Sequence, residues 1–129
     1  MKIEDRRAGL RILAADEDVH ALEQTSVLLR RLGHEVTGLA VDAAGAADRI
    51  AREDPDLAVV VVHRDDEHAL NLIEELNEFA SGPVVALLHR HDPEFISRAA
   101  ERGISAYASS ATRESVQAAI GRASCRERV

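Results

Sequence analysis

The sequence predicts a single α/β domain built on a doubly wound, five-stranded parallel sheet, and three observations predict it. Apolar runs alternate with amphipathic stretches from Leu10 onward. The run LAVVVV at 57–62 is apolar on both faces, which is typical of a strand in the middle of a parallel sheet. Strict alternation of strands and helices requires right-handed crossovers, which place helices on both faces of the sheet.

The five strands are expected where apolar residues gather in short runs. They cover 10–15, 34–41, 56–62, 83–88 and 104–108. Pro83 opens the fourth run, and proline is tolerated at the first residue of a strand. Each run is followed by a stretch with helical character, so the chain reads as five strand–helix units.

The five helices are expected between and after these strands, at 16–33, 43–54, 67–82, 91–103 and 112–120. Asp16 or Asp18 can cap the start of the first helix, and Gly33 suits the left-handed position after its end. Asp92 and Gly103 do the same for the fourth helix, where Pro93 fits the first helical position.

The second and third helices have simpler signals. The second is Ala-rich and is closed by Pro55, because the residue before a proline disfavours helical backbone. The third carries one apolar face, made by Leu70, Ile73, Leu76 and Phe79.

Composition restricts the class of protein. The chain has 129 residues, of which 46% are apolar and 2% aromatic, so Ala, Val, Leu and Ile must build its core. The single cysteine, Cys125, excludes an internal disulfide framework. No apolar run approaches the roughly 18 residues that span a bilayer, and MKIEDRRAG has no apolar signal core, so a cytoplasmic protein without membrane contact is expected. A net charge of −7 argues against direct binding of DNA or RNA by this domain.

Three segments are predicted: a tail at 1–9, one domain at 10–119, and a doubtful end at 120–129. The last ten residues, IGRASCRERV, coincide with one reading frame of a common sequencing adapter, so we expect them to replace the natural continuation after Ala119. The alternative is a genuine basic helix end, with Arg122, Arg126 and Arg128 near the negative pole of the helix dipole.

Functional side chains of such a sheet collect at the carboxyl ends of its strands. The residues at these positions are Asp16, Glu17, Val61, Val62, His63, Leu88, His89, Ser109 and Ser110. None of them forms a pairing of a nucleophile with a base, so an enzyme is not expected.

Four segments resemble the receiver domain of bacterial response regulators, namely ILAADED, PDLAVVVV, PVVALL and ERGISAYASS. The resemblance covers 10–119. It implies the flavodoxin-like receiver fold, (β/α)5, with the strand order 2-1-3-4-5. It also implies a site that transfers a phosphoryl group to an aspartate at the end of the third strand, beside Mg²⁺ held by acidic residues after the first.

Aligned with that family, the chain departs from its site. In that family, a Thr or Ser after the fourth strand and a Lys after the fifth contact the phosphoryl oxygens. Here the phosphoacceptor position falls on Val61, the hydroxyl position on Leu88 and the lysine position on Ser110. Asp16 and Glu17 match the acidic pair, and two interpretations of them stay open: capping of the following helix, or weak binding of Mg²⁺. The domain is not expected to require a cofactor under either interpretation. Tyr107 matches the aromatic switch position, although it could equally be an amphipathic residue with a solvated hydroxyl.

Two other sites are weighed against simpler interpretations. Asp65 or Asp66 could stand in as the phosphoacceptor, but each lies several residues beyond the site and is better explained as a solvated loop charge. His63 and His89 could join Asp16 and Glu17 around a transition metal ion, whereas exposed histidines on a polar rim are the simpler interpretation.

The sequence therefore suggests a degenerate receiver that works without phosphorylation as a protein-interaction or homodimerisation module. Three segments are most similar to receivers that precede ANTAR-type RNA-binding domains of transcription antiterminators. They are EHALNLIEEL, PVVALLHRHDPEFISRAAERGISAYA and SVQAAI. RNA binding would then belong to an output domain that this chain lacks. The alternatives are a phosphoacceptor receiver that uses a non-standard carboxylate, and a metal- or small-molecule-binding flavodoxin-like module.

Overall fold

The computed structural model describes residues 9–62, 66–79, 82–109 and 112–126. Within these ranges, strands and helices alternate along the chain, as the sequence predicts. The strands are β1 (Arg11–Ala15), β2 (Glu35–Ala40), β3 (Leu57–Val62), β4 (Val84–Leu88) and β5 (Ala106–Ala108). The helices are α2 (Val19–Arg31), α3 (Ala43–Glu53), α4 (Asp66–Phe79), α5 (Pro93–Arg102) and α6 (Arg113–Arg126).

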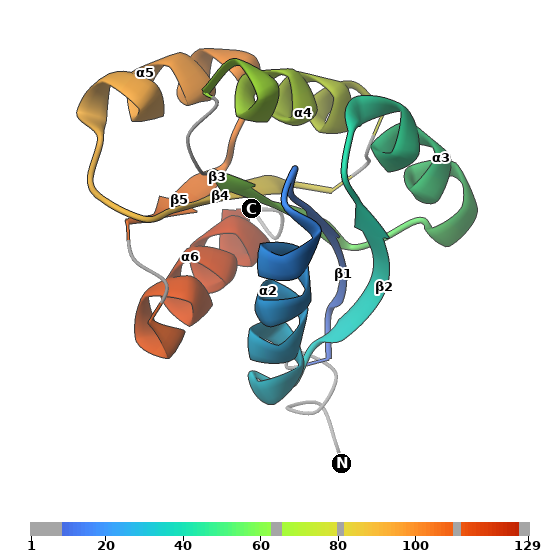
Figure 1. Cartoon of the computed structure of the whole chain (residues 1–129). Coiled ribbons are helices and arrows are strands. Elements are labelled where there is room, and N and C mark those ends of the chain that lie inside the picture. The colour runs from blue at the N-terminus through green and yellow to red at the C-terminus, as the bar shows by residue number, and fades with distance from the viewer. Residues whose placement is uncertain (1–8, 63–65, 80–81, 110–111, 127–129) are drawn as a thin grey trace.

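The strands form one parallel sheet in the order β2-β1-β3-β4-β5, which confirms the predicted order. Helices α2 and α6 cover one face of the sheet, and α3, α4 and α5 cover the other (Figure 1). β3 lies in the centre and is buried along its whole length. Its alternating side chains divide between two apolar layers: Val59 and Val61 face α2 and α6, whereas Val60 and Val62 face α4.

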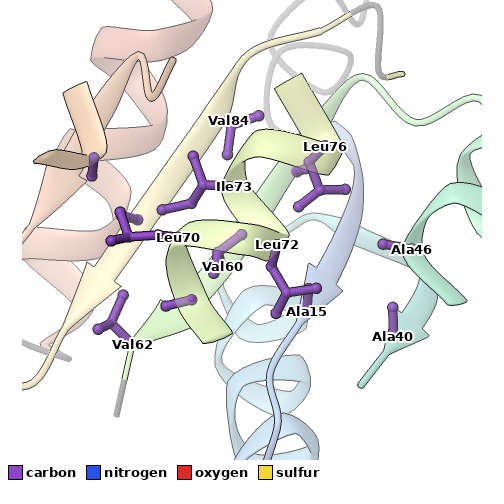
Figure 2. Packing of buried hydrophobic residues seen from close by; sticks show 14 of the residues in the cluster. Ala15, Ala40, Ala46, Val60, Val62, Leu70, Leu72, Ile73, Leu76 and Val84 are labelled. Atoms are coloured by element: carbon purple, nitrogen blue, oxygen red, sulfur yellow. The ribbon is translucent and has the colours of Figure 1, made fainter. Parts of the chain in front are cut away.

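The core beneath α4 is built mainly from aliphatic side chains. Leu70 and Ile73 of α4 lie over Val60 and Val62 of β3 (Figure 2), and all four are buried. Each buried side chain of this size contributes roughly 1.5–3 kcal/mol to folding. The predicted apolar face of α4 needs one correction, because Phe79 is 52% exposed. It is the last residue of α4, so it lies at the end of the helix rather than over the sheet.

The signals at the helix ends are found as the sequence predicts. Asp18 caps α2, and Asp92 caps α5 with Pro93 in the first turn. Gly33 and Gly103 have positive φ values of 97° and 112°. These are left-handed conformations that favour glycine.

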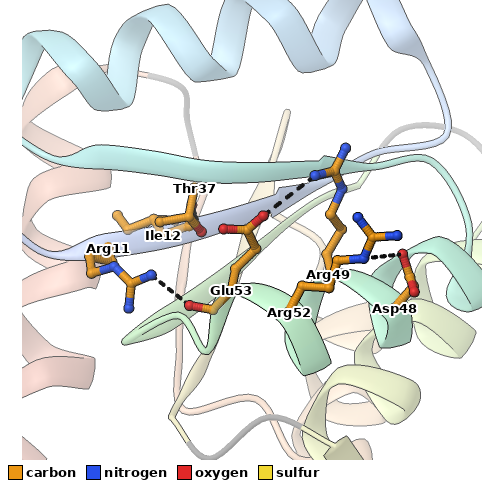
Figure 3. A network of polar contacts seen from close by, with 7 residues as sticks. All are labelled: Arg11, Ile12, Thr37, Asp48, Arg49, Arg52 and Glu53. Carbon is orange, nitrogen blue, oxygen red and sulfur yellow. Dashed lines mark hydrogen bonds and ion pairs between the residues drawn. The ribbon is translucent and has the colours of Figure 1, made fainter.

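The end of α3 is held by a contact that the sequence did not reveal. Asp54 follows α3 in the left-handed region, with φ 49°, before Pro55. The Arg11 guanidinium donates a hydrogen bond to the carbonyl oxygen of Glu53 at 2.6 Å (Figure 3). It donates a second one to the carbonyl oxygen of Asp54 at 2.9 Å. Since the last carbonyls of a helix lack partners within it, Arg11 satisfies two of them and ties β1 to α3.

Helix α6 continues to Arg126, past the predicted limit at residue 120. Ala123 is fully buried in the layer beneath α2 and α6. The segment contains no proline, and its single Gly121 does not interrupt the helix. A foreign origin of residues 120–129 stays a prediction, because helical packing is independent of where a segment comes from. No described helix is long and apolar enough to span a membrane.

Candidate functional site

The register of the central strands brings the predicted residues to one edge of the sheet. Ala15 of β1 pairs with Val60 of β3, so Asp16 and Val61 are the next residues along two neighbouring strands. Val62 pairs with Leu88, the last residue of β4. Acidic and apolar residues therefore meet at the carboxyl edge, where this fold usually places its chemistry.

Asp16 is fully buried and supports the turn between β1 and α2. Its Oδ1 atom accepts a hydrogen bond from the Asp18 backbone N–H at 2.9 Å. The Asp18 carboxylate in turn accepts hydrogen bonds from the N–H groups of His20 and Ala21. Capping thus belongs to Asp18, while Asp16 orders the turn that leads to it. Glu17 is exposed.

Val61 and Leu88 make the adjoining part of the edge apolar. They are 7% and 5% exposed, and they belong to the two opposite core layers. An aliphatic side chain can neither attack phosphorus nor donate a hydrogen bond to an oxyanion. These two positions therefore contribute packing to the edge and no group that could react.

Val61 and Leu88 limit the oxygen ligands that the described part of this edge offers to Mg²⁺. Mg²⁺ takes oxygen ligands in near-octahedral geometry, and these two side chains add none to the carboxylates of Asp16 and Glu17. Among the residues that the structure describes, no group of three or more His, Cys, Asp or Glu side chains could hold a metal ion.

Several predicted positions lie outside the described residues: His63, Asp65 and Ser110. The hypothesis of a metal ion between His63 and His89 is therefore untested. Asp66 is the first residue of α4. Two neighbours of these positions can be placed. His89 is exposed, and the Nδ1 atom of His91 lies 3.3 Å from the Ser109 hydroxyl oxygen.

A pocket of about 260 Å³ adjoins Val61 between α2 and the ends of β3 and β4. Its lining consists of Ala21, Gln24, Thr25, Leu28, Val61, Leu87, Leu88 and His89. Sequence analysis identified Val61, Leu88 and His89, and it missed Leu87 and the residues from α2. Thr25 recurs at helical spacing with Leu22, Leu29 and Leu32, and a polar residue in this apolar stripe is a signal that could have indicated the pocket.

Tyr107 lies at a second pocket, of about 310 Å³, formed by α5, β5 and α6. The residue is half-buried and packs against the core layer under α4 and α5. Its carbonyl oxygen accepts a hydrogen bond from Arg122 at 2.9 Å. The lining of this pocket is Ile96, Ala100, Ile104, Ser105, Ala106, Tyr107 and Arg122. Sequence analysis found Tyr107 alone, because the others come from three separate elements.

The sheet order and the two helical layers define the receiver-domain fold of response regulators, a flavodoxin-like architecture. Solved structures agree over nearly the whole chain. The signal receiver domain of the response regulator NarL from Mycobacterium tuberculosis is 20% identical, with a TM-score of 0.73, and the match covers 90% of this chain and 97% of that one.

Two further structures show the same likeness. The signal receiver domain of a modulated diguanylate cyclase from Desulfovibrio desulfuricans G20 has a TM-score of 0.78 at 17% identity, over 93% of this chain and 97% of that one. A chain of the CheX–CheY complex with BeF3⁻ and Mg²⁺ from Borrelia burgdorferi has a TM-score of 0.75 at 13% identity, over 91% and 90%. Models of known protein families and curated protein sequences give no match. At these identities, the shared property is the fold.

Proposed function

We propose that this chain is a degenerate receiver domain that acts in the cytoplasm as a protein-interaction and dimerisation module, without phosphorylation. The observation that carries the proposal is the buried aliphatic Val61 of the central strand β3, whose register places it beside Asp16 at the end of the neighbouring β1. In the family that the sequence resembles, this position accepts the phosphoryl group. Leu88 supports the proposal from the neighbouring strand, because it leaves the edge without a hydroxyl group.

The partner surface in this proposal is the one formed by α5, β5 and α6. Ile96 and Ile104 are only half-buried there, and they flank the hollow beside Tyr107. An apolar hollow with a tyrosine at its margin is a composition that protein interfaces favour. The CheX–CheY structure illustrates that a protein of this fold can assemble with a partner.

The output of the proposed module is an ANTAR-type RNA-binding domain that follows α6 in the natural protein and is missing here. The support is the sequence similarity to receivers of that class, together with the adapter-like residues 120–129. Sequencing the genomic locus downstream of Ala119 tests this part. A continuing helix followed by a short three-helix domain is expected, and a native stop codon directly after Ala119 would contradict it.

Self-association tests the proposed surface. Ala100 is an exposed residue of α5 that lines the hollow, so Ala100→Arg places a charged side chain in the interface without disturbing the core. In sedimentation equilibrium, the unmodified chain is expected to dimerise, and Ala100→Arg to weaken the dimer by about tenfold or more.

Ala51→Arg provides the matched control, because Ala51 is an exposed residue of α3, on another part of the surface. It should dimerise as the unmodified chain does. A chain that stays monomeric at all concentrations, or a dimer that both variants weaken equally, would contradict the proposed surface.

A further inference from the structure

The pocket beside Val61 has an apolar floor at the edge where the sequence resemblance implies phosphate chemistry. Val61 and Leu87 belong to the core layer that faces α2 and α6, and each is less than 10% exposed. Leu28 of α2 adds a partly buried wall from the helix side. The hollow therefore adjoins the core and offers an apolar surface to whatever enters it.

Polar groups line the pocket along its margin. Gln24 and Thr25 come from α2, and His89 follows β4. Within the described ranges, the side chains of Gln24 and Thr25 have no hydrogen-bond partner in the protein. An amide and a hydroxyl can each donate and accept hydrogen bonds, so this margin can hold a neutral polar group of a ligand.

Charge disfavours anions at this place. The described residues of the lining include no Lys, Arg, Asp or Glu side chain. The acidic residues Asp16, Glu17 and Asp18 stand just before α2, and the whole chain has a net charge of −7. Among these described residues, a phosphate or carboxylate finds no Lys or Arg to pair with, and the nearby carboxylates oppose its entry.

Size restricts the occupant to a small molecule. The volume of about 260 Å³ corresponds to about nine waters, at about 30 Å³ each. This is at the lower end of ligand pockets and too small to accept the side of a helix.

We propose that the pocket binds a small uncharged molecule, which has an apolar body over Val61, Leu87 and Leu28 and one hydrogen-bonding end at Gln24 and Thr25. Binding of such a ligand would let a small molecule act on the domain at the carboxyl edge of β3. The proposal is independent of the surface formed by α5, β5 and α6, and its test measures binding directly, so the two proposals fail separately.

Two probes with one ring and different polar ends test the pocket: benzyl alcohol and benzoate. Methyl and amide NMR spectra of the full chain are recorded during titration with each. Benzyl alcohol is expected to shift the signals of Val61, Leu87 and Leu28 saturably, with a Kd of about 1 mM for a ligand of this size. Benzoate is expected to bind about tenfold more weakly, because its charge has no counter-ion there.

Two variants locate the binding. Ala21 is half-buried on α2 and lines the pocket, so Ala21→Phe should fill the hollow from its margin and weaken benzyl alcohol binding by about tenfold or more. Ala51→Phe, on the exposed side of α3, should bind the probe as the unmodified chain does. Thermal melting of each variant establishes that it is folded. The absence of saturable shifts, equal binding of benzoate, or full binding by a folded Ala21→Phe variant would overturn the proposal.

Discussion

Val61 determines what the carboxyl edge of the sheet can do. Its side chain is aliphatic and buried, and it faces the layer of α2 and α6. The neighbouring Asp16 is held by its hydrogen bond to the Asp18 N–H, so it serves the turn before α2. At the scale of single residues, the edge combines an acidic turn with an apolar floor.

Gly103 gives a residue-scale prediction about stability. Its φ of 112° is left-handed, and an added Cβ atom would lie 2.4 Å from the Asn77 side chain of α4. Gly103→Ala should lower the free energy of unfolding by about 1–3 kcal/mol, through strain and crowding together. Chemical denaturation of the purified variant measures the change.

The matched control is Gly121→Ala in α6. Nothing lies within 4 Å of the position of its Cβ atom, and its φ is outside the left-handed region. Because alanine favours helix more than glycine does, this variant should gain about 0.5–1 kcal/mol. Equal stability of Gly103→Ala and the unmodified chain would contradict the role given to Gly103.

Residues differ in how well the sequence predicts them. Gly103 was predictable, because the pattern of Asp92, Pro93 and a glycine one helix later is specific. The exposure of Phe79 was not, since helical spacing defines a face but not how far the covered sheet extends. The contact that holds the left-handed Asp54 was missed for a similar reason, because it comes from Arg11, more than forty residues away in the sequence.

Helix α2 is the element that links the fold to the candidate pocket. Its start is fixed by the Asp18 cap, whose carboxylate accepts hydrogen bonds at 3.0 and 3.3 Å. One side of the helix reaches the core through Leu22 and Leu29, while Gln24 and Thr25 border the pocket. The cap therefore sets the position from which these polar groups meet the sheet edge.

Asp18→Ala tests this role of the cap. Loss of the two hydrogen bonds should cost about 1 kcal/mol of unfolding free energy, and it should weaken benzyl alcohol binding if α2 frays at its start. Denaturation curves and the NMR titration measure the two effects.

Asp48→Ala in α3 serves as its control. Asp48 forms an exposed ion pair with Arg52, with 3.4 Å between Oδ2 and Nε. Such a pair contributes only a few tenths of a kcal/mol. If both variants lose the same stability, the cap of α2 has no special role.

Elements were predicted more reliably than their ends. Every strand and helix of the described chain was expected, because periodicity and caps act locally. The continuation of α6 to Arg126 agrees with the alternative of a basic helix end, whereas the main argument about residues 120–129 concerned their origin rather than their helix propensity. The pockets could not be predicted from the sequence either, because each combines residues of at least three elements that only the tertiary structure places together.

At the scale of the whole molecule, the receiver-domain fold is present, and we propose that the phosphate site implied by the sequence resemblance is incomplete. The sheet order, the two helical layers and the likeness to solved receivers establish the fold. The proposed departure from a receiver site concerns three strand ends, of which Val61 and Leu88 are described and Ser110 lies outside the described residues. Fold and chemistry can separate in this way, because core packing keeps the architecture while a few edge residues supply the reaction.

Incubation with acetyl phosphate and Mg²⁺, followed by intact-protein mass spectrometry, tests the central claim most directly. The account predicts no phosphoryl adduct on the unmodified chain and the same oligomeric state in the presence and absence of acetyl phosphate. A receiver with a complete site, treated in parallel, controls for active reagent. A phosphoryl group on any aspartate of this chain, Asp65 and Asp66 included, would contradict the claim that the domain works without phosphorylation.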